Sequence, residues 1–311
     1  MTSIVLTGTS GFIGSGILRE FERLGLRVRT GYRSSTQHGR PDTFRHGDLD
    51  TENRWEQFFA GAAVVVHAAG PAHIRAHRGD AGRDRRAIVD GTLFLLRGAA
   101  KAGVRRVVYL SSAHAYGSSS SAFHRIVETD PLRPHGPYAE AKAEADRLVL
   151  EEALRLEIEA VAIRPPMVYG PRAPGNFGRL VKLAKLPLPL PLGAATAKRS
   201  FVAIENLASA IVAAVRYEGP LIGPFNVTDD HDLSTSEMVS VIREGLGVRD
   251  WQLPVPRRLL DLAAGAIGRR EEIGKLLDPY QLDAARFMTA TGWRPRITAR
   301  EAVRRAAAGS L

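Results

Sequence analysis

Three residues whose side chains can bind or transfer protons lie in two neighbouring segments of the sequence. Tyr138 and Lys142 stand four places apart in a run rich in Ala, Glu and Leu, which is typical of a helix. Residues at i and i+4 share one helix face, so the phenol and the ammonium are expected to lie side by side. Ser112 ends Arg105–Ser112, an apolar run typical of a buried strand. Because ligands of open α/β sheets bind beyond the carboxyl ends of strands, we expect all three side chains to converge there.

This set of side chains is suited to the reduction of a carbonyl group. Transfer of a hydride to the carbonyl carbon leaves an alkoxide that must be protonated. A free phenol has a pKa of about 10, and a nearby ammonium is expected to lower the pKa of Tyr138. Tyr138 would then act as general acid and base, Ser112 would hydrogen-bond the substrate oxygen, and Lys142 would also hold the nicotinamide ribose. The alternative is a surface tyrosine beside a solvated lysine.

A glycine-rich turn favours the catalytic interpretation. In "TGTSGFIG", Gly8, Gly11 and Gly14 follow the first apolar strand and open the first helix-like segment. Such glycines let the backbone turn tightly and approach a pyrophosphate at the helix N-terminus. The spacing is GxxGxxG, which differs from the common GxGxxG. Its place at the first strand–helix junction nevertheless predicts a dinucleotide site.

The residues after the second strand bear on the choice of cofactor. An acidic residue there would bind the ribose 2′-hydroxyl of NAD, whereas an arginine would receive the 2′-phosphate of NADP. This chain has Arg33 and Ser34 and no carboxylate. The sequence therefore favours NADP(H), with NAD(H) as the alternative. Further on, Asp48 and Leu49 stand where the adenine is expected, although Asp48 is equally typical of a turn.

Strands and helix-like segments alternate over the first half of the chain. Continuous apolar runs such as Ala62–His67 and Ile158–Pro166 predict strands that are buried on both faces. The sequence predicts an α/β fold, a doubly wound parallel sheet of Rossmann type with a smaller C-terminal substrate-binding lobe. Helices are expected over Phe12–Leu24 and Gly91–Gly103.

The second half of the chain lacks a clear alternation of strands and helices. The proline-punctuated stretch Leu186–Gly193 excludes a helix or a central strand, and Ser234 with Glu237 predicts a capping box. We expect a dinucleotide-binding domain at 1–170 with a returning segment at about 199–228, and a smaller lobe at 171–198 and 229–311.

Composition excludes several classes of protein. The chain has 311 residues, of which 44% are hydrophobic and 24% charged, and it has no cysteine, so disulfide and thiolate chemistry are excluded. No apolar run approaches the roughly 20 residues that span a bilayer, and no signal-peptide pattern is present. We therefore expect a cytoplasmic protein without a membrane partner. The net charge is +10, but the basic residues are scattered, so neither nucleic acid nor a metal is expected as a partner, whereas small anionic ligands fit.

The motifs together resemble the extended short-chain dehydrogenase/reductase family, in its epimerase/dehydratase branch that acts on nucleotide sugars. The resemblance covers essentially the whole chain and is carried by "TGTSGFIG", "GDLD", "VVHAAG", "SSAHAYG", "ETDPLRPHGPYAEAK", "RPPMVYGPRAPGNFGRL" and "RSFVAIENLASAI". It implies a Ser112–Tyr138–Lys142 triad and a homodimer formed by the Gly91–Gly103 and Tyr138 helices. The cofactor-binding residues that it implies are Gly8, Gly11, Phe12, Ile13, Gly14, Ala68, Ala69, Gly70, Pro165 and Val168. The substrate-binding residues would be Ser112, Ala113, His114, Asn176 and Arg199.

The sequence departs from the family pattern at two places, and the second departure narrows the expected reaction. Relatives commonly carry an Asn shortly before the Gly91-Thr92 helix start, where this chain has Ile88 and Asp90 nearby and no Asn. Sugar 4,6-dehydratases typically carry an Asp-Glu pair after the catalytic hydroxyl residue, where this chain has Ala113-His114. Without that acid and base, elimination of water is not expected. His114 either touches the substrate or stabilises its own loop.

Several reactions remain open. Arg33 favours an NADPH-dependent reductase of a 4-keto sugar linked to UDP or dTDP. The alternative is a UDP-sugar 4-epimerase with retained NAD. A reductase of a non-sugar ketone or aldehyde, and a cofactor sensor without turnover, are the further alternatives, although a sensor would usually lack Tyr138 or Lys142.

Overall fold

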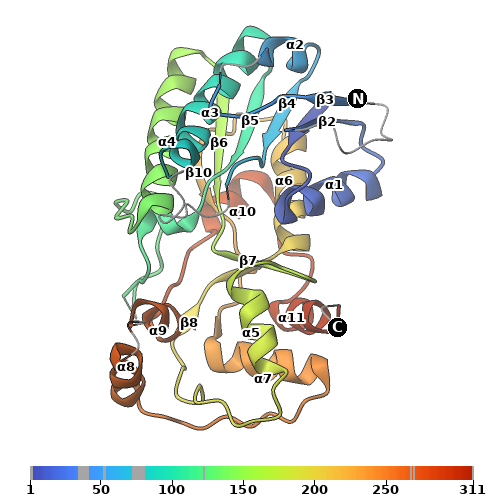
Figure 1. Cartoon of the computed structure of the whole chain (residues 1–311). Helices are drawn as coiled ribbons and strands as arrows, with labels where there is room; N and C mark the ends of the chain where they lie inside the picture. The colour runs from blue at the N-terminus through green and yellow to red at the C-terminus, as the bar shows by residue number, and fades with distance from the viewer. Residues whose placement is uncertain are drawn as a thin grey trace.

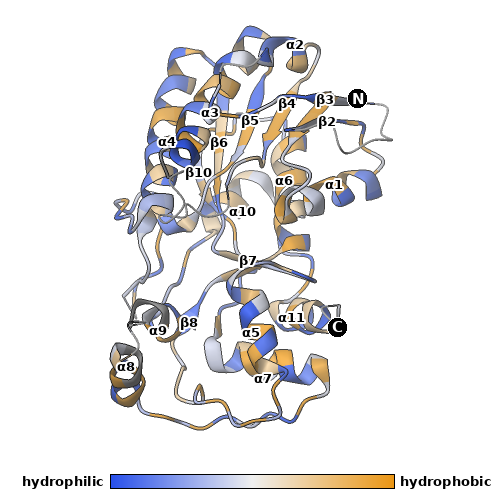
Figure 2. Ribbon diagram, in the orientation of Figure 1, coloured by the Kyte–Doolittle hydropathy of each residue, from blue (hydrophilic) through white to orange (hydrophobic). Residues whose placement is uncertain are grey.

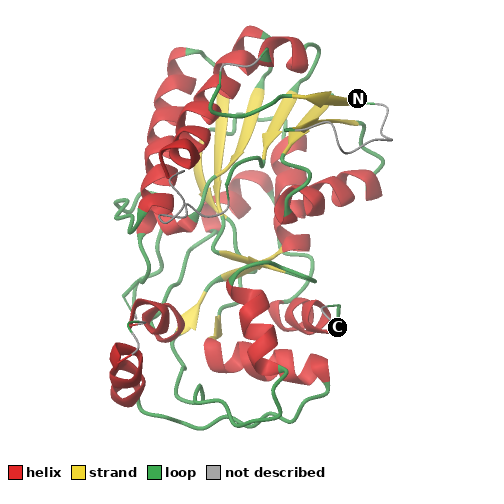
Figure 3. Ribbon diagram, viewed as in Figure 1, coloured by secondary structure: helices red, strands yellow, loops and turns green. Residues whose placement is uncertain are grey.

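The structure is a computed structural model, and it describes residues 3–33, 42–51, 54–71, 81–121, 123–266, 268 and 270–309. Two bodies lie one above the other (Figure 1). The upper body contains a large sheet with helices on both faces, and the lower body is a smaller lobe of helices and short strands. The chain passes several times between them (Figure 3).

The sheet has seven parallel strands in the order β10-β6-β5-β4-β1-β2-β3. The order reverses between β1 and β4, so the carboxyl ends of these two strands flank the expected ligand crevice. The bounds are β1 (Ile4–Thr7), β2 (Val28–Tyr32), β3 (Thr43–Arg45), β4 (Val64–His67), β5 (Arg106–Leu110), β6 (Glu159–Arg164) and β10 (Gly223–Asn226).

Helices cover both faces of this sheet. On one face, α1 (Phe12–Arg23) and α6 (Ile204–Arg216) pack against alternate strand residues such as Leu6 and Val66. On the other face, α2 (Trp55–Phe59), α3 (Ala81–Lys101) and α4 (Pro137–Arg155) pack against Val5 and Val65. The central strands are apolar on both sides, as the orange ribbons of Figure 2 show, which explains their unbroken hydrophobic runs. The predicted fold class is confirmed.

The smaller lobe has its own core. Its elements are β7 (Met167–Tyr169), α5 (Asn176–Ala184), β8 (Lys198–Arg199), β9 (Phe201–Ala203), β11 (Leu233–Ser234), α7 (Thr235–Leu246), α8 (Arg257–Ala266), α9 (Arg270–Leu277) and α11 (Ala299–Ala308). Phe177, Met238, Ile242 and Val303 are among the side chains that bury one another there. The predicted capping box is present at the start of α7, where the Ser234 hydroxyl accepts from the Glu237 N–H at 3.1 Å.

Some elements differ from the sequence-based expectations. Helix α3 begins at Ala81, ten residues before the expected start, because the charged stretch after Ala81 is helical as well. The short elements β3 and α2 were not foreseen. Helix α10 (Ala285–Thr291) lies in the stretch assigned above to the lobe, yet Phe287 packs in the core beside the sheet with Phe225 of β10. Among the described residues, no helix is long and apolar enough to cross a membrane.

Candidate functional site

The glycine turn closes tightly against the neighbouring strand. Gly8 has φ +80°, and a Cβ there would lie 2.4 Å from the Ala68 carbonyl carbon. A Cβ on Gly14 would lie 2.1 Å from the Gly8 oxygen. The helix N-terminus after this turn has no side-chain cap, so its first N–H groups are left for a ligand. A cradle that only glycines can form fits a dinucleotide pyrophosphate.

A pocket of about 460 Å³ opens beside the turn, over the ends of β1, β2 and β4. Eight of the expected cofactor residues line it: Gly8, Gly11, Arg33, Asp48, Leu49, Ala68, Ala69 and Gly70. The remaining lining residues, which sequence reasoning missed, are Ser10, Gly31, Tyr32, His46, Asp50, Pro71, Arg83, Asp84 and Ala87. Phe12 and Ile13 do not line it, because their side chains pack against the lobe core and the sheet core respectively. Ser34 lies outside the described residues.

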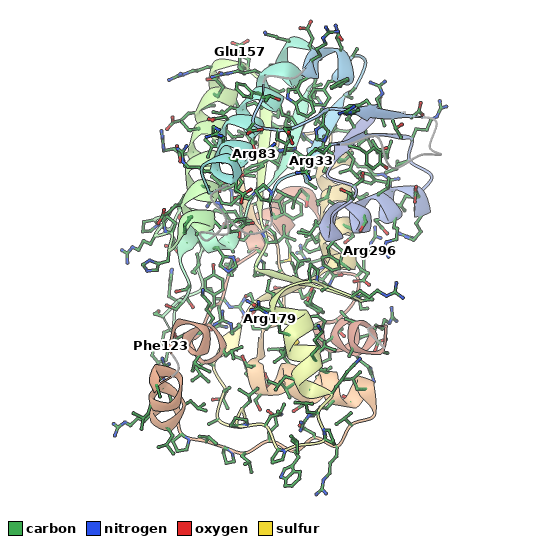
Figure 4. The ribbon with its side chains drawn as sticks, viewed as in Figure 1. Arg33, Arg83, Phe123, Glu157, Arg179 and Arg296 are labelled. Carbon is green, nitrogen blue, oxygen red and sulfur yellow. The ribbon has the colours of Figure 1, made fainter. Side chains whose placement is uncertain are left out.

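Charged side chains line the end of this pocket that lies away from the glycine turn. Arg83 Nη2 lies 2.8 Å from Asp48 Oδ2, and Arg83 Nε lies 3.5 Å from Asp50 Oδ2. Arg33 and Arg83 lie near each other in the side-chain view (Figure 4) and both line the pocket. His46 is buried with Nδ1 at 2.8 Å from the Gly47 carbonyl, and burial lowers the pKa of its imidazole. Two guanidinium groups at one pocket end suit a ligand phosphate.

Ser112 lies immediately after β5 and caps the short helix η1 (Ala113–Tyr116). Its hydroxyl accepts from the His114 N–H at 3.2 Å and lies 3.1 Å from His114 Nδ1. The Ala113 N–H donates to the Pro165 carbonyl at 3.0 Å. The serine is thus buried and held in one orientation, while the His114 side chain is exposed beside it.

Tyr138 comes from the first turn of α4, which Pro137 begins. Its phenol shares a side-chain hydrogen bond with Ser112. Lys142, one turn on, donates from Nζ to the Leu110 carbonyl at 2.7 Å and lies 5.0 Å from the centroid of the Tyr109 ring. Three side chains from two segments therefore meet at the carboxyl end of β5.

The expected lowering of the phenol pKa was wrong for this arrangement. Burial raises the pKa of Tyr138 to about 12, and the hydrogen bond from Ser112 only opposes that rise. Burial also lowers the pKa of Lys142 to about 8, against the attraction of Asp146. The ammonium is occupied by the Leu110 carbonyl rather than by the phenol, so desolvation is the dominant influence on Tyr138.

Below this set lies a group that sequence reasoning missed, which we call the buried bracket: Asp146, Arg164 and Tyr116. Arg164 Nε donates to Asp146 Oδ2 at 2.6 Å, and Arg164 Nη1 donates to the Tyr116 hydroxyl at 2.7 Å. All three side chains are buried. The bracket joins α4, which carries Tyr138 and Lys142, to η1, which follows Ser112. The one signal in the sequence was a carboxylate four residues after Lys142 on the same helix face.

Two of the five expected substrate residues, Asn176 and Arg199, lie in the smaller lobe, whereas Ser112, Ala113 and His114 follow β5. Arg199 in β8 donates to the Asp278 carbonyl, and its guanidinium carbon lies 5.5 Å from the centroid of the Tyr280 ring. The Tyr280 hydroxyl in turn donates to the Ala113 carbonyl. Asn176 is exposed at the start of α5.

The remaining expected residues, Pro165 and Val168, lie where the chain leaves the sheet for the lobe, Pro165 buried and Val168 half-buried. Arg199 is thus connected to the reacting end through Tyr280, whereas Asn176 belongs to a helix of the smaller lobe.

Comparison with known proteins identifies the family. The family model described as the NAD dependent epimerase/dehydratase family matches residues 4–227. The chain belongs to this family. Like its members, the protein is an enzyme of extended short-chain dehydrogenase/reductase type, and the resemblance seen in the motifs is confirmed.

Individual relatives match over most of the chain. A UDP-glucose 4-epimerase of Vibrio cholerae is 30% identical over 99% of this chain and 95% of its own length. A dTDP-glucose 4,6-dehydratase of Streptomyces griseus is 30% identical over 80% of each chain. A solved structure, MoeE5 in complex with UDP-glucuronic acid and NAD, is 26% identical with a TM-score of 0.77 and covers 99% of this chain and 98% of that one.

Proposed function

We propose that this epimerase/dehydratase-family enzyme epimerises a UDP-linked sugar at C4. The observation that supports this most directly is the hydrogen bond between Tyr138 and Ser112 at the carboxyl end of β5, beside a glycine cradle that fits a dinucleotide. The bound nicotinamide would accept and return the hydride. The full-length relative named UDP-glucose 4-epimerase supports the choice of reaction.

The side chains divide the proton chemistry between them. Tyr138 removes the proton from the C4 hydroxyl as the hydride leaves and returns it when the other face is reduced. Ser112 holds the same oxygen by a hydrogen bond. Lys142, held by the Leu110 carbonyl, binds the ribose of the dinucleotide. Arg199 and Asn176 are the proposed contacts of the nucleotide diphosphate.

Dehydration fits the site less well, although a dehydratase is among the relatives. Removal of water across C5 and C6 requires an acid and a base next to the catalytic hydroxyl. Ala113 has no titratable group, and the His114 imidazole lies within 3.1 Å of Ser112 Oγ. A single imidazole does not replace a carboxylate pair.

A second candidate is an NADPH-dependent reductase of a 4-keto sugar. The observation that favours it is Arg33 in the pocket, at the strand end where an NAD-binding relative would carry a carboxylate. A reductase must exchange its cofactor at every turnover, whereas an epimerase must retain it. Cofactor retention therefore separates the two candidates.

The deciding experiment measures the purified protein without added cofactor. Denaturation should release NAD in an amount close to one per chain. The native protein should convert UDP-glucose to UDP-galactose without added cofactor. A protein that is free of NAD and oxidises NADPH only when a 4-keto sugar nucleotide is added would support the reductase instead. Failure of UDP and dTDP to raise the melting temperature would overturn both and leave a non-sugar substrate or a sensor.

We also propose that α3 and α4 form the dimer interface. The two helices lie side by side and are joined by the Arg97–Glu152 pair at 2.7 Å and by the Arg85–Glu144 pair. Light scattering of the purified protein should give twice the mass of one chain.

A further inference from the structure

The edge of the smaller lobe that lies farthest from the sheet exposes a row of apolar side chains, which we call the leucine ridge: Leu183, Leu186, Leu188, Trp251 and Leu253. Their exposed fractions are 37%, 44%, 57%, 48% and 43%. Two loop segments form most of this edge (Figures 1 and 3). They lie side by side, because the Leu190 N–H donates to the Trp251 carbonyl at 3.0 Å and the Leu253 N–H to the Leu190 carbonyl at 2.8 Å.

A buried arginine fixes the ridge from inside. Arg243 of α7 is fully buried. Its guanidinium donates to the carbonyls of Trp251 and Leu188 at 2.7 Å and to that of Leu186 at 3.1 Å. The backbone of both loops is therefore held in one arrangement, with these side chains directed outward, while the next leucines of the repeat, Leu190 and Leu192, are buried.

The charged residues next to the first loop of the ridge are all basic. Residues 160–204 contain no Asp or Glu, and α5 with the residue after it carries Arg179, Lys182 and Lys185. Lys182 is exposed on α5 beside the ridge. On the other loop, the guanidinium carbon of Arg249 lies 5.8 Å from the centroid of the Trp251 ring. The neighbouring Asp250 carboxylate accepts from Ser240 Oγ at 2.6 Å.

We propose that the leucine ridge docks the enzyme on the surface of an anionic lipid bilayer. Leucine and tryptophan side chains on a basic surface enter the boundary between headgroups and acyl chains, while Lys and Arg pair with the lipid phosphates. A second copy of the chain is a poorer occupant, because a two-fold contact would bring two basic surfaces, each with Lys182 and Arg249, together. Docking requires no membrane-spanning helix, so the absence of an apolar span in the sequence does not oppose it.

The tryptophans provide a direct readout. The chain has three, and Trp55 and Trp293 are 1% and 6% exposed, whereas Trp251 is 48% exposed. Vesicles of phosphatidylcholine with phosphatidylglycerol should shift the protein emission to shorter wavelength, and brominated acyl chains should quench it. Both effects should weaken as salt is raised, and vesicles of phosphatidylcholine alone should bind far less.

Matched variants locate the contact. Leu186→Ser and Leu188→Ser should each weaken vesicle binding roughly tenfold. Ile222→Ser is the control, because Ile222 is 46% exposed but lies outside the ridge, just before β10. Lys182→Glu and Arg249→Glu should also weaken binding while leaving the apolar side chains intact. Melting temperatures confirm that each variant is folded.

Three results would overturn the proposal: no binding to the anionic vesicles, equal binding by the ridge variants and the Ile222→Ser control, or a change of oligomeric state in the ridge variants. The last result would identify a second copy as the occupant. Epimerase activity on a water-soluble UDP-sugar is expected to be unchanged in all ridge variants, so failure of this proposal is distinguishable from failure of the proposed reaction.

Discussion

At the reacting end of the crevice, Tyr138 and Lys142 stand above the buried bracket, whereas at the opposite end Arg83 and Asp48 meet at the surface. The bracket pair Arg164–Asp146 has side chains that are 4% and 1% exposed, and the Arg83–Asp48 pair has side chains that are 52% and 43% exposed. The distances are similar, 2.6 and 2.8 Å. The two ion pairs therefore differ in the burial of their side chains and not in the distance between their charged atoms.

The difference has a physical meaning. Breaking a buried ion pair leaves an uncompensated charge in a medium of low dielectric constant. An exposed pair contributes about 0–1 kcal/mol and exchanges partners with water or a ligand at little cost. The end that must hold hydroxyl groups in register is fixed, and the end that receives the outer part of the dinucleotide can rearrange its ion pairs around it.

The largest expected effect is on turnover. Tyr138→Phe removes the proton donor and keeps the ring, so kcat should fall by about 10²–10⁴-fold. Dinucleotide affinity, measured by calorimetric titration, should stay unchanged. Tyr217→Phe, at the end of α6, is the control and should keep full activity. Unchanged turnover in Tyr138→Phe would refute the assignment of the proton donor.

The second prediction breaks the buried bracket. Asp146→Asn leaves Arg164 buried without its counter-charge, so the free energy of unfolding should fall by about 3–5 kcal/mol. Urea unfolding followed by circular dichroism measures it. Glu151→Gln is the matched control on the same helix, since it removes an exposed pair with Arg147 and should change stability by less than about 1 kcal/mol. Equal losses in the two variants would remove the distinction drawn above.

The third prediction concerns acid. His67, at the end of β4, lies 2.8 Å from Thr7 Oγ1, and burial lowers the pKa of its imidazole to about 3. Between pH about 6.5 and about 3 the unfolded chain binds a proton at His67 that the folded chain does not. The free energy of unfolding should therefore fall as pH falls through this window, by up to about 1.4 kcal/mol per pH unit from this group.

A substitution tests that slope. In His67→Gln, urea unfolding at a series of pH values should give a shallower decline than in the unaltered protein, whatever the change in absolute stability. Parallel pH profiles would show that His67 is not the group responsible.

The smallest expected effect is at the outer end of the pocket. Arg83→Ala removes the exposed pairs with Asp48 and Asp50, and the unfolding free energy should change by less than about 1 kcal/mol. Calorimetric unfolding is the measurement. A loss comparable with that of Asp146→Asn would show that this end is as rigid as the other.

Local patterns in the sequence were sufficient to predict the sheet. Val64, Val65 and Val66 form an unbroken apolar run because helices cover both faces of β4, and such a pattern is visible without coordinates. The start of α3 was missed because its first turns are charged and carry no apolar periodicity. Arg83, Arg85 and Arg86 in these turns are exposed, so no buried face marks the start of the helix.

The candidate site was predicted only in part, because local patterns reveal its motifs but not the contacts between residues distant in the sequence. Ser112 and Tyr138 follow from motifs, and the hydrogen bond between them is present. The contacts of Arg164 with Asp146 and Tyr116 join residues 18 and 48 positions apart, and no local pattern encodes such a contact. The direction of the Tyr138 pKa shift also depended on how much protein surrounds the ring, which sequence spacing does not reveal.

The hydroxyl of Tyr280 connects the smaller lobe to the segment that follows β5, next to Ser112. It donates to the Ala113 carbonyl, one peptide beyond Ser112, while the ring lies beneath the Arg199 guanidinium. A movement of Tyr280 away from the sheet would break this hydrogen bond or displace the backbone next to Ser112. The proposed contact of Arg199 with the substrate diphosphate would therefore be coupled to the position of the Ser112 hydroxyl.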